Sequence, residues 1–180
     1  MSTYFTAILP PFDVTVPLRA ELAVYPEYGS LQQGLRWSPP DQWHVTLSYY
    51  GALRDPDGRA ETLRTVFAQC RRPTVRLAGS GTFGRVLWLG VEDLGEGDLD
   101  LLAALAGGSE RDYVPHLTVA RAETRVDPEW TRRFQRYESA SWTVTEVVLL
   151  RSDPGQGGPV YTEVERFPLT AGRGGPVVGW

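Results

Sequence analysis

Lysine is absent from this chain, so all 18 of its basic side chains are arginines. A guanidinium can bind phosphate through two hydrogen bonds, which makes arginines candidates for phosphate recognition. The arginines are spread along the whole chain, however, and a coding preference for arginine over lysine explains that spread better than a function does. A formal net charge of −4 excludes a general attraction for nucleic acid. Any nucleic acid must therefore be held in a local positive cleft, through short contacts.

Cysteine and long apolar runs are also scarce. The single Cys70 excludes an internal disulfide bond and fits a reducing compartment. No apolar stretch approaches the roughly 20 residues needed to cross a bilayer, so no membrane association is expected. The N-terminus lacks a basic flank, and Pro10, Pro11 and Asp13 interrupt its short apolar run, which argues against a signal peptide. We therefore expect a cytoplasmic protein.

Histidine is nearly as rare, and both histidines stand in the same local pattern. Each opens a His-x-Thr-aliphatic tetrapeptide, and the two are 72 positions apart. The tetrapeptides are His44-Val45-Thr46-Leu47 and His116-Leu117-Thr118-Val119. Threonine fills about one position in twelve, so chance would place it two residues after both histidines in under about one per cent of sequences. We therefore predict that both tetrapeptides serve one site.

Hydrophobic periodicity and turn residues predict alternating strands and helices. Strands are expected at residues 3–9, 35–37, 43–50, 74–78, 85–91, 116–120, 142–151 and 160–167. Helices are expected at residues 17–25, 59–70, 98–106 and 128–137. Pro17 is expected in the first turn of the first helix, and Asp127 is expected as N-cap of the last. Residues 79–81 are interpreted as a turn, and the strand at 85–91 as buried on both faces.

The order of these elements predicts an α+β fold with two lobes. No linker separates independent domains, and 180 residues suffice for one well-buried domain. Strands and helices fall into two comparable halves, each carrying one His-x-Thr motif on a strand. We predict one domain over residues 1–170, built from two pseudo-symmetric lobes of antiparallel sheet and helices, with the active site in the cleft between them. Residues 171–180 are rich in glycine and proline and are expected to form a flexible tail.

The motifs offer matching chemistry on each strand. Side chains alternate across a strand, so His44 and Thr46 share one face, as do His116 and Thr118. If the strands pair or pack about a pseudo-two-fold axis, two imidazoles and two hydroxyls converge. One neutral imidazole could take a proton from an attacking water while the other, protonated, gives one to a leaving ribose oxygen. The hydroxyls could donate hydrogen bonds to phosphate oxygens.

Other interpretations fit the motifs less well. Histidines satisfied by hydrogen bonds in the core are the default for any single histidine, but they do not explain the doubled pattern. A zinc site would need carboxylates, and neither motif contains one. A serine or cysteine nucleophile lacks a Gly-x-Ser-x-Gly signature, and Cys70 lies on the apolar stripe of a predicted helix.

The paired motifs resemble those of the two-histidine (2H) phosphoesterases, in particular the bacterial RNA 2′,3′-cyclic phosphodiesterases, historically called 2′-5′ RNA ligases. The resemblance covers residues 3–169. Its further segments are Phe5-Thr6-Ala7-Ile8-Leu9-Pro10, Leu35-Arg36-Trp37, Arg85-Val86-Leu87-Trp88-Leu89-Gly90-Val91, Pro115 and the ending that contains Tyr161. The chain departs from the common pattern at Trp43, Tyr49-Tyr50 and Val119. These departures lie beside the histidines and bear on substrate preference rather than on reaction type.

The resemblance implies hydrolysis of an RNA terminal 2′,3′-cyclic phosphate to a 2′-phosphate, with no metal and no cofactor. It implies that His44 donates a proton to the leaving 3′ oxygen and that His116 accepts the proton of the attacking water. Thr46 and Thr118 would hold the phosphate, with Arg121 as an additional contact. RNA ends bearing the cyclic phosphate are the implied partners, and no obligate protein partner is implied.

Several further possibilities stay open. Phe5 or Tyr50 could stack on the terminal base, although a place in the core explains each of them better. An RNA 5′-hydroxyl could replace water as the attacking group, which would give 2′-5′ ligation without ATP. The substrate could instead be a 2′,5′-linked oligonucleotide or a small cyclic nucleotide phosphate, or the protein could bind RNA ends without catalysis.

Overall fold

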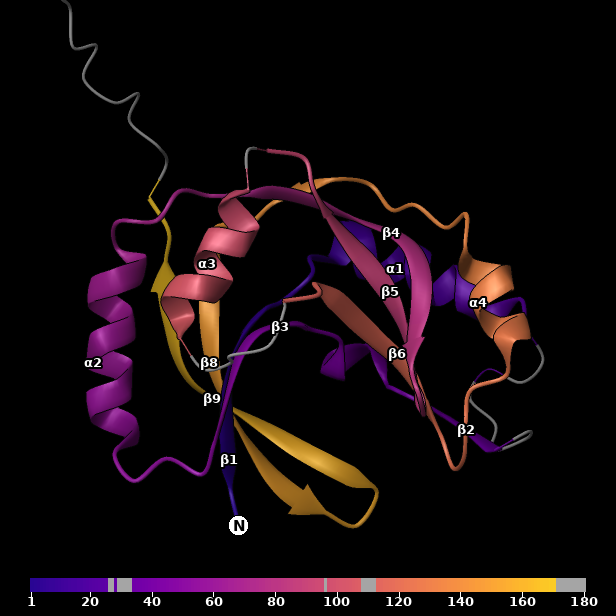
Figure 1. Ribbon diagram of the computed structural model, residues 1–180, viewed down its shortest axis with the longest axis horizontal. Helices are drawn as coiled ribbons and strands as arrows, with labels where there is room; N and C mark the ends of the chain where they lie inside the picture. The colour runs from indigo at the N-terminus through magenta and orange to yellow at the C-terminus, as the bar shows by residue number, and fades with distance from the viewer. Residues whose placement is uncertain (26–27, 29–33, 96, 108–112, 171–180) are drawn as a thin grey trace, which may run out of the picture.

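Strands from both ends of the chain join in one curled antiparallel sheet in the computed structural model (Figure 1). The structure describes residues 1–25, 28, 34–95, 97–107 and 113–170, so the tail predicted at 171–180 lies outside the described residues. The strand order is β7-β4-β5-β6-β3-β1-β8-β9, and β2 pairs with β6 as well. With helices packed on this sheet, the predicted α+β class is confirmed.

The strands have the following bounds: β1 (Thr3–Ile8), β2 (Leu35–Trp37), β3 (Val45–Gly51), β4 (Thr74–Phe83), β5 (Val86–Asp93), β6 (His116–Ala122), β7 (Trp142–Thr143), β8 (Glu146–Gly155) and β9 (Gly158–Pro168). The helices of the described residues are α1 (Phe12–Ala23), α2 (Pro56–Phe67), α3 (Asp98–Ala106), α4 (Pro128–Phe134) and the 3₁₀ turn η2 (Pro40–Gln42). None of these helices has the length and apolar character of a membrane span.

The sheet divides into two halves where β3 meets β6. One half contains β3, β1, β8 and β9 and is covered by α2 and α3; the other contains β6, β5, β4, β7 and β2, with α1 and α4 beside it (Figure 1). Within the described residues, a single pair, Val45 with Leu117, joins the halves in the sheet, and both side chains are fully buried. The junction therefore lies at the centre of both His-x-Thr motifs.

Two helices begin earlier than predicted. The buried residues Val14, Leu18 and Leu22 of α1 repeat every four positions, so the helical period starts before Pro17, which lies inside the helix rather than in its first turn. A proline inside a helix removes one backbone hydrogen bond without necessarily ending the helix. Helix α2 begins at Pro56, because the preceding Asp55 accepts a hydrogen bond from the Gly58 amide at 2.9 Å and caps the first turn.

The turn predicted at residues 79–81 is wrong, because these residues continue strand β4. Their place in the strand is marked by a β-bulge between Leu77 and Ser80, and Gly79 has a φ of 65°. The turn follows instead at Gly84, with a φ of 61°. Burial of β5 on both faces is also wrong, since Trp88 and its neighbours on that face are partly exposed.

The strand predicted at residues 142–151 is divided between the two halves of the sheet. Its first part, β7, pairs with β4, whereas β8 pairs with β1. The segment between β7 and β8 contains Val144, whose side chain is buried. The hairpin of β8 and β9 is also longer than predicted, because the strands pair up to Gly155 and Gly158.

Candidate active site

The two His-x-Thr motifs meet at the junction of β3 and β6. Their central residues, Val45 and Leu117, are antiparallel partners. A two-fold axis between such partners relates each motif to the other, so His44 lies across from Thr118, and Thr46 across from His116. Because the central pair points into the core, the four polar side chains face the opposite side of the sheet.

Both histidines are held in the same way by the backbone. Nδ1 of His44 lies 2.7 Å from the carbonyl oxygen of Gln42, and Nδ1 of His116 lies 2.7 Å from that of Val114. A carbonyl oxygen only accepts hydrogen bonds, so each Nδ1 carries a proton and donates. The Nε2 atom of each ring is therefore the atom available to accept or donate a proton at the site.

Burial lowers the pKa of both imidazoles below the ordinary value of 6.5. The positive charge of Arg121 lowers both values further, and His116 has the same effect on His44. The hydrogen bonds to the backbone carbonyls oppose these effects, because they stabilise the protonated rings. Both imidazoles are thus harder to protonate than an exposed histidine.

Aromatic side chains hold the ring of His44. Phe5 from β1 lies with its ring centroid 4.9 Å from that of the imidazole, and Tyr161 from β9 lies 5.2 Å away, edge to face. Phe5 also contacts Tyr161 at 5.3 Å. Tyr161 was not predicted as a site residue, although the segment that contains it is part of the family resemblance, and it comes from a strand 117 positions after His44.

A second aromatic pair holds the ring of His116. Phe83 and Trp88 from the β4–β5 hairpin have their ring centroids 5.0 and 6.0 Å from the imidazole centroid. Gly81 permits this arrangement, since a Cβ atom there would lie 2.3 Å from the Trp88 indole. Phe83 was not predicted as a site residue, and its half-exposed position at the end of β4 is visible only in the tertiary structure.

The four motif side chains are divided between two adjoining hollows. The His44 hollow, about 130 Å³, is lined by polar groups that include His44, Thr118, Arg121 and Tyr161. The His116 hollow, about 580 Å³, is more apolar, and its lining includes Thr46, Tyr49, Phe83, Tyr113 and His116. A phosphate between the motifs would thus face a small polar hollow on one side and a larger aromatic one on the other.

Arg121 reaches the polar side of the sheet because of a β-bulge. Strict alternation after His116 and Thr118 would send position 121 to the buried face. In the pairing of β5 with β6, however, Leu87 faces Ala120 and Trp88 faces Thr118, which leaves Val119 as an extra residue. Arg121 is therefore exposed and lines the His44 hollow.

The two residues predicted to stack on a base lie in different places. Phe5 is next to His44 but only 5% exposed, so its ring supports the imidazole more than it offers a free face. Tyr50 does not line either hollow within the described residues; its hydroxyl donates to the carbonyl of Ala106 at 2.9 Å, and its ring contacts Arg59. A second bulge in β3 places Tyr50 outside the regular pairing with β1.

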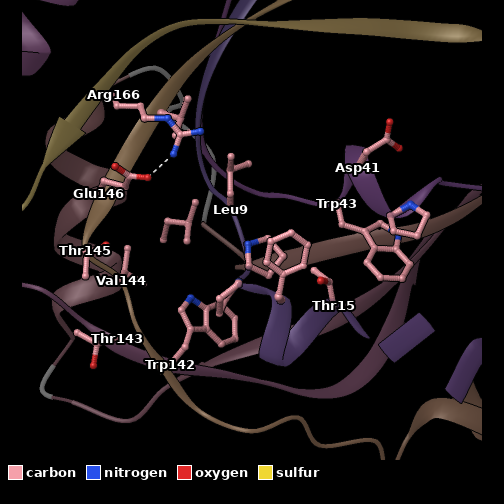
Figure 2. Close-up of a pocket in the computed structure, with 16 residues that line it drawn as sticks. Leu9, Thr15, Asp41, Trp43, Trp142, Thr143, Val144, Thr145, Glu146 and Arg166 are labelled. Carbon is pink, nitrogen blue, oxygen red and sulfur yellow. Dashed lines mark hydrogen bonds and ion pairs between the residues drawn. The ribbon is translucent and has the colours of Figure 1, made fainter. Parts of the chain in front are cut away.

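Another hollow, of about 510 Å³, lies near the start of α1 (Figure 2). Trp43 and Trp142 face it, and an ion pair between Arg166 and Glu146 closes one end. Trp43 precedes His44 directly, so alternation along the chain points the two side chains to opposite sides. None of the described residues that line this hollow lines the His44 hollow or the His116 hollow.

The chain is similar to a family model and to several known proteins. A family model described as the 2′-5′ RNA ligase superfamily matches residues 25–156. An RNA 2′,3′-cyclic phosphodiesterase from Methanothermobacter thermautotrophicus is 33% identical over 155 residues, covering 75% of this chain and 83% of that protein. A protein of the same name from Thermus thermophilus is 29% identical over 196 residues, covering 94% of this chain and 91% of its own.

Solved structures share the fold. A crystal structure of a Thermus thermophilus protein, TT0787, superposes with a TM-score of 0.71 at 25% identity, covering 95% of this chain and all of that one. Escherichia coli LigT in complex with 3′-AMP superposes with a TM-score of 0.69 at 24% identity, covering 94% of this chain and 98% of its own.

Proposed function

This chain belongs to the 2′-5′ RNA ligase superfamily, and we propose that it hydrolyses the 2′,3′-cyclic phosphate at an RNA end, with His44 and His116 as acid and base. Its relatives in two thermophilic organisms are named RNA 2′,3′-cyclic phosphodiesterases. The observation that carries the proposal is the pairing of Val45 with Leu117, which relates the two motifs by a two-fold axis and leaves both Nε2 atoms free.

Hydrolysis requires one proton transfer on each side of the phosphorus. Nε2 of neutral His116 takes a proton from water as the water oxygen bonds to phosphorus. The bond from phosphorus to the 3′ oxygen breaks, and protonated His44 gives its Nε2 proton to that oxygen. The products are a 2′-phosphate and a free 3′-hydroxyl, and exchange with solvent returns both rings to their starting states.

The remaining groups of the site stabilise charge on the phosphoryl oxygens. Thr46 and Thr118 would donate hydrogen bonds to the two non-bridging oxygens, one from each motif. Arg121 adds a positive charge next to both histidines, since it lowers the pKa of each. A bound phosphate offsets this charge and raises the pKa of both rings, which favours protonation of His44 in the complex.

The first test replaces each histidine by alanine. His44→Ala and His116→Ala should each lower kcat on adenosine 2′,3′-cyclic phosphate by about 10²–10⁴-fold, because each removes one proton transfer. Phosphorus NMR should show a 2′-phosphate product for the unaltered chain, formed equally well with EDTA present. Gln69→Ala, at an exposed position after α2, is the control and should keep its rate.

The thermal midpoint of each variant should stay close to that of the unaltered chain, which separates lost chemistry from lost folding. Near-normal turnover in either histidine variant would contradict the two-histidine mechanism. Loss of turnover in EDTA that zinc restores would contradict metal independence. Tight binding of the cyclic phosphate with no product would favour a binding protein instead.

The size of the His116 hollow favours a second reaction at the same site. Its volume of about 580 Å³ far exceeds what one attacking water needs, and Tyr49 and Phe83 are 53% and 46% exposed at its wall. Aromatic faces of this kind stack on nucleic-acid bases. We propose that a nucleoside 5′-hydroxyl can enter here in place of water, which gives 2′-5′ ligation.

Excess 5′-hydroxyl RNA should then yield a junction resistant to nucleases specific for 3′-5′ linkages. If no such product forms at a saturating concentration of the 5′-hydroxyl RNA, the ligation proposal is wrong and only the proposed hydrolysis remains. Since water is the more abundant nucleophile, hydrolysis should dominate at low acceptor concentration.

A further inference from the structure

Three arginines from separate elements line one hollow beside the candidate site. Arg36 comes from β2, Arg85 from the turn between β4 and β5, and Arg121 from β6. We call this space of about 810 Å³ the arginine hollow. Arg36 and Arg121 also line the His44 hollow, so the two spaces adjoin. In a chain with a net charge of −4, this local excess of positive charge needs an explanation.

The pairing of β2 with β6 brings two of these arginines together, which destabilises the fold unless an anion binds between them. Arg36 and Arg121 are direct partners in the pairing of β2 with β6, and like charges in that position destabilise a sheet. Within the described residues, neither of them forms an ion pair with a carboxylate. Arg36 instead donates to the carbonyl of Gly157 at 3.1 Å.

Arg85 adds a third charge with little compensation. Its guanidinium lies 3.4 Å from the backbone carbonyl of Glu123, a long contact. Glu123 also supplies a carboxylate to the described lining, and its side chain is exposed. Three guanidiniums therefore face one carboxylate, an arrangement suited to an anion with several acceptor oxygens.

An aromatic side chain completes this hollow. Phe83 lines both the arginine hollow and the His116 hollow, and 46% of its surface is exposed. Basic groups that follow a backbone, combined with an exposed aromatic ring, are the usual means of holding single-stranded nucleic acid. The two features occur together here, directly beside the motifs.

We propose that the arginine hollow binds the phosphodiester group that precedes the terminal nucleotide of an RNA chain. The inference rests on the proposed function, because the cyclic phosphate must lie between the motifs. The terminal nucleotide then passes from the His44 hollow toward Arg36 and Arg121, and the preceding phosphate reaches Arg85. The enzyme consequently acts on oligonucleotide ends in preference to mononucleotides, and the leaving 3′ oxygen lies on the side of His44.

The test compares three substrates that differ only before the terminal nucleotide. They are adenosine 2′,3′-cyclic phosphate, its 5′-phosphorylated form, and the dinucleotide ApA 2′,3′-cyclic phosphate. The dinucleotide should have a kcat/KM at least about tenfold above that of the nucleoside, since charge-assisted hydrogen bonds contribute on this scale. Arg85→Gln should reduce the ratio of these two kcat/KM values at least fivefold, while Arg85→Lys should keep part of it.

Arg54→Gln is the matched control. Arg54 is exposed beyond the far end of β3, so this change should leave the ratio as it is. Thermal midpoints of all variants establish that each one is folded.

Equal kcat/KM values for the three substrates would overturn the inference while leaving the proposed function intact. A ratio that survives Arg85→Gln, or a gain confined to the 5′-phosphorylated mononucleotide, would also overturn it. No turnover of any substrate by the folded, unaltered chain would overturn the proposed function and the inference with it.

Discussion

Each motif histidine is oriented by one hydrogen bond to its own local backbone. The carbonyl groups of Gln42 and Val114 stand two residues before His44 and His116, and both accept from Nδ1. The tautomer and the ring plane are thereby set before any substrate binds. Exchange of acid and base roles needs no movement of either ring, because both present the same Nε2 atom.

The lowered pKa values of the two histidines predict an acidic optimum. In the proposed mechanism, kcat/KM requires one protonated and one neutral imidazole in the free enzyme, and burial lowers the pKa of both below 6.5. The fraction with one proton therefore peaks between two values that both lie under 6.5. We expect a bell-shaped profile of kcat/KM, measured on adenosine 2′,3′-cyclic phosphate at constant ionic strength, with its maximum below pH 6.5.

Folding stability provides the control for this profile. A histidine whose pKa is lowered in the folded state binds protons more tightly when unfolded, so stability should fall as the pH drops below 6.5. Thermal midpoints across the same pH range identify where unfolding, rather than protonation, reduces the rate. A maximum of kcat/KM above pH 7 would contradict the burial of the two rings.

At the scale of elements, bulges decide which side chains reach the site. The extra residue in β6 turns Arg121 toward the histidines, and the bulge at Gly79 lets β4 continue to Phe83. Bulges re-aim side chains without breaking the sheet. The β4–β5 hairpin therefore supports His116 through Phe83 and Trp88. Gly81 is the position in β4 that leaves room for the Trp88 indole.

Substitution of Gly81 by alanine tests this support. A Cβ atom would lie 2.3 Å from the indole of Trp88, which packs beside His116, so the ring must move. Overpacking of this kind costs about 1–3 kcal/mol, and we expect a lower thermal midpoint together with a lower kcat.

Gly157→Ala is the matched control for stability, because nothing lies within 4 Å of a Cβ atom at that position. Its thermal midpoint should stay within the small range typical of surface changes. Equal midpoints for the two alanine variants would show that Trp88 does not depend on Gly81.

At the scale of the whole molecule, the site is a property of the junction between the halves of the sheet. Only one residue pair joins β3 to β6 in the described part of the chain, and the sheet diverges on both sides of it. The His44 hollow and the His116 hollow lie beside this junction. Each half contributes one imidazole and one hydroxyl, so the candidate site exists only where both halves meet.

The charge distribution predicts a weak dependence on salt. The net charge is −4, and the proposed RNA-binding surface contains the three guanidiniums of the arginine hollow. For single-stranded nucleic acid, the slope of log binding constant against log salt concentration is about −0.7 for each neutralised phosphate. If the three guanidiniums neutralise up to three phosphates, log kcat/KM on a short RNA should fall against log salt concentration with a slope no steeper than about −2. A slope near −5 would indicate a much larger basic surface.

Much of this protein was determined locally by its sequence. Helix α3 has its predicted bounds, β2 does as well, and Asp127 caps α4 by accepting from the Glu129 amide at 2.8 Å. The predicted strands that carry the motifs are present, although β3 begins at Val45, one residue after His44, because the turn η2 precedes it. These features depend on neighbouring residues, which is why periodicity and capping patterns predict them.

The tertiary structure alone decided which distant side chains complete the site. Tyr161 and Phe83 reach the histidines from strands far away in the chain, and Tyr50 points elsewhere although it follows Thr46 by only four residues. The sequence pattern cannot locate a bulge, because a bulge depends on how two strands pair. The histidines and threonines of the motifs therefore predict the chemistry of the site from the sequence, while the walls of the site and the arginines beside it depend on the register of the assembled sheet.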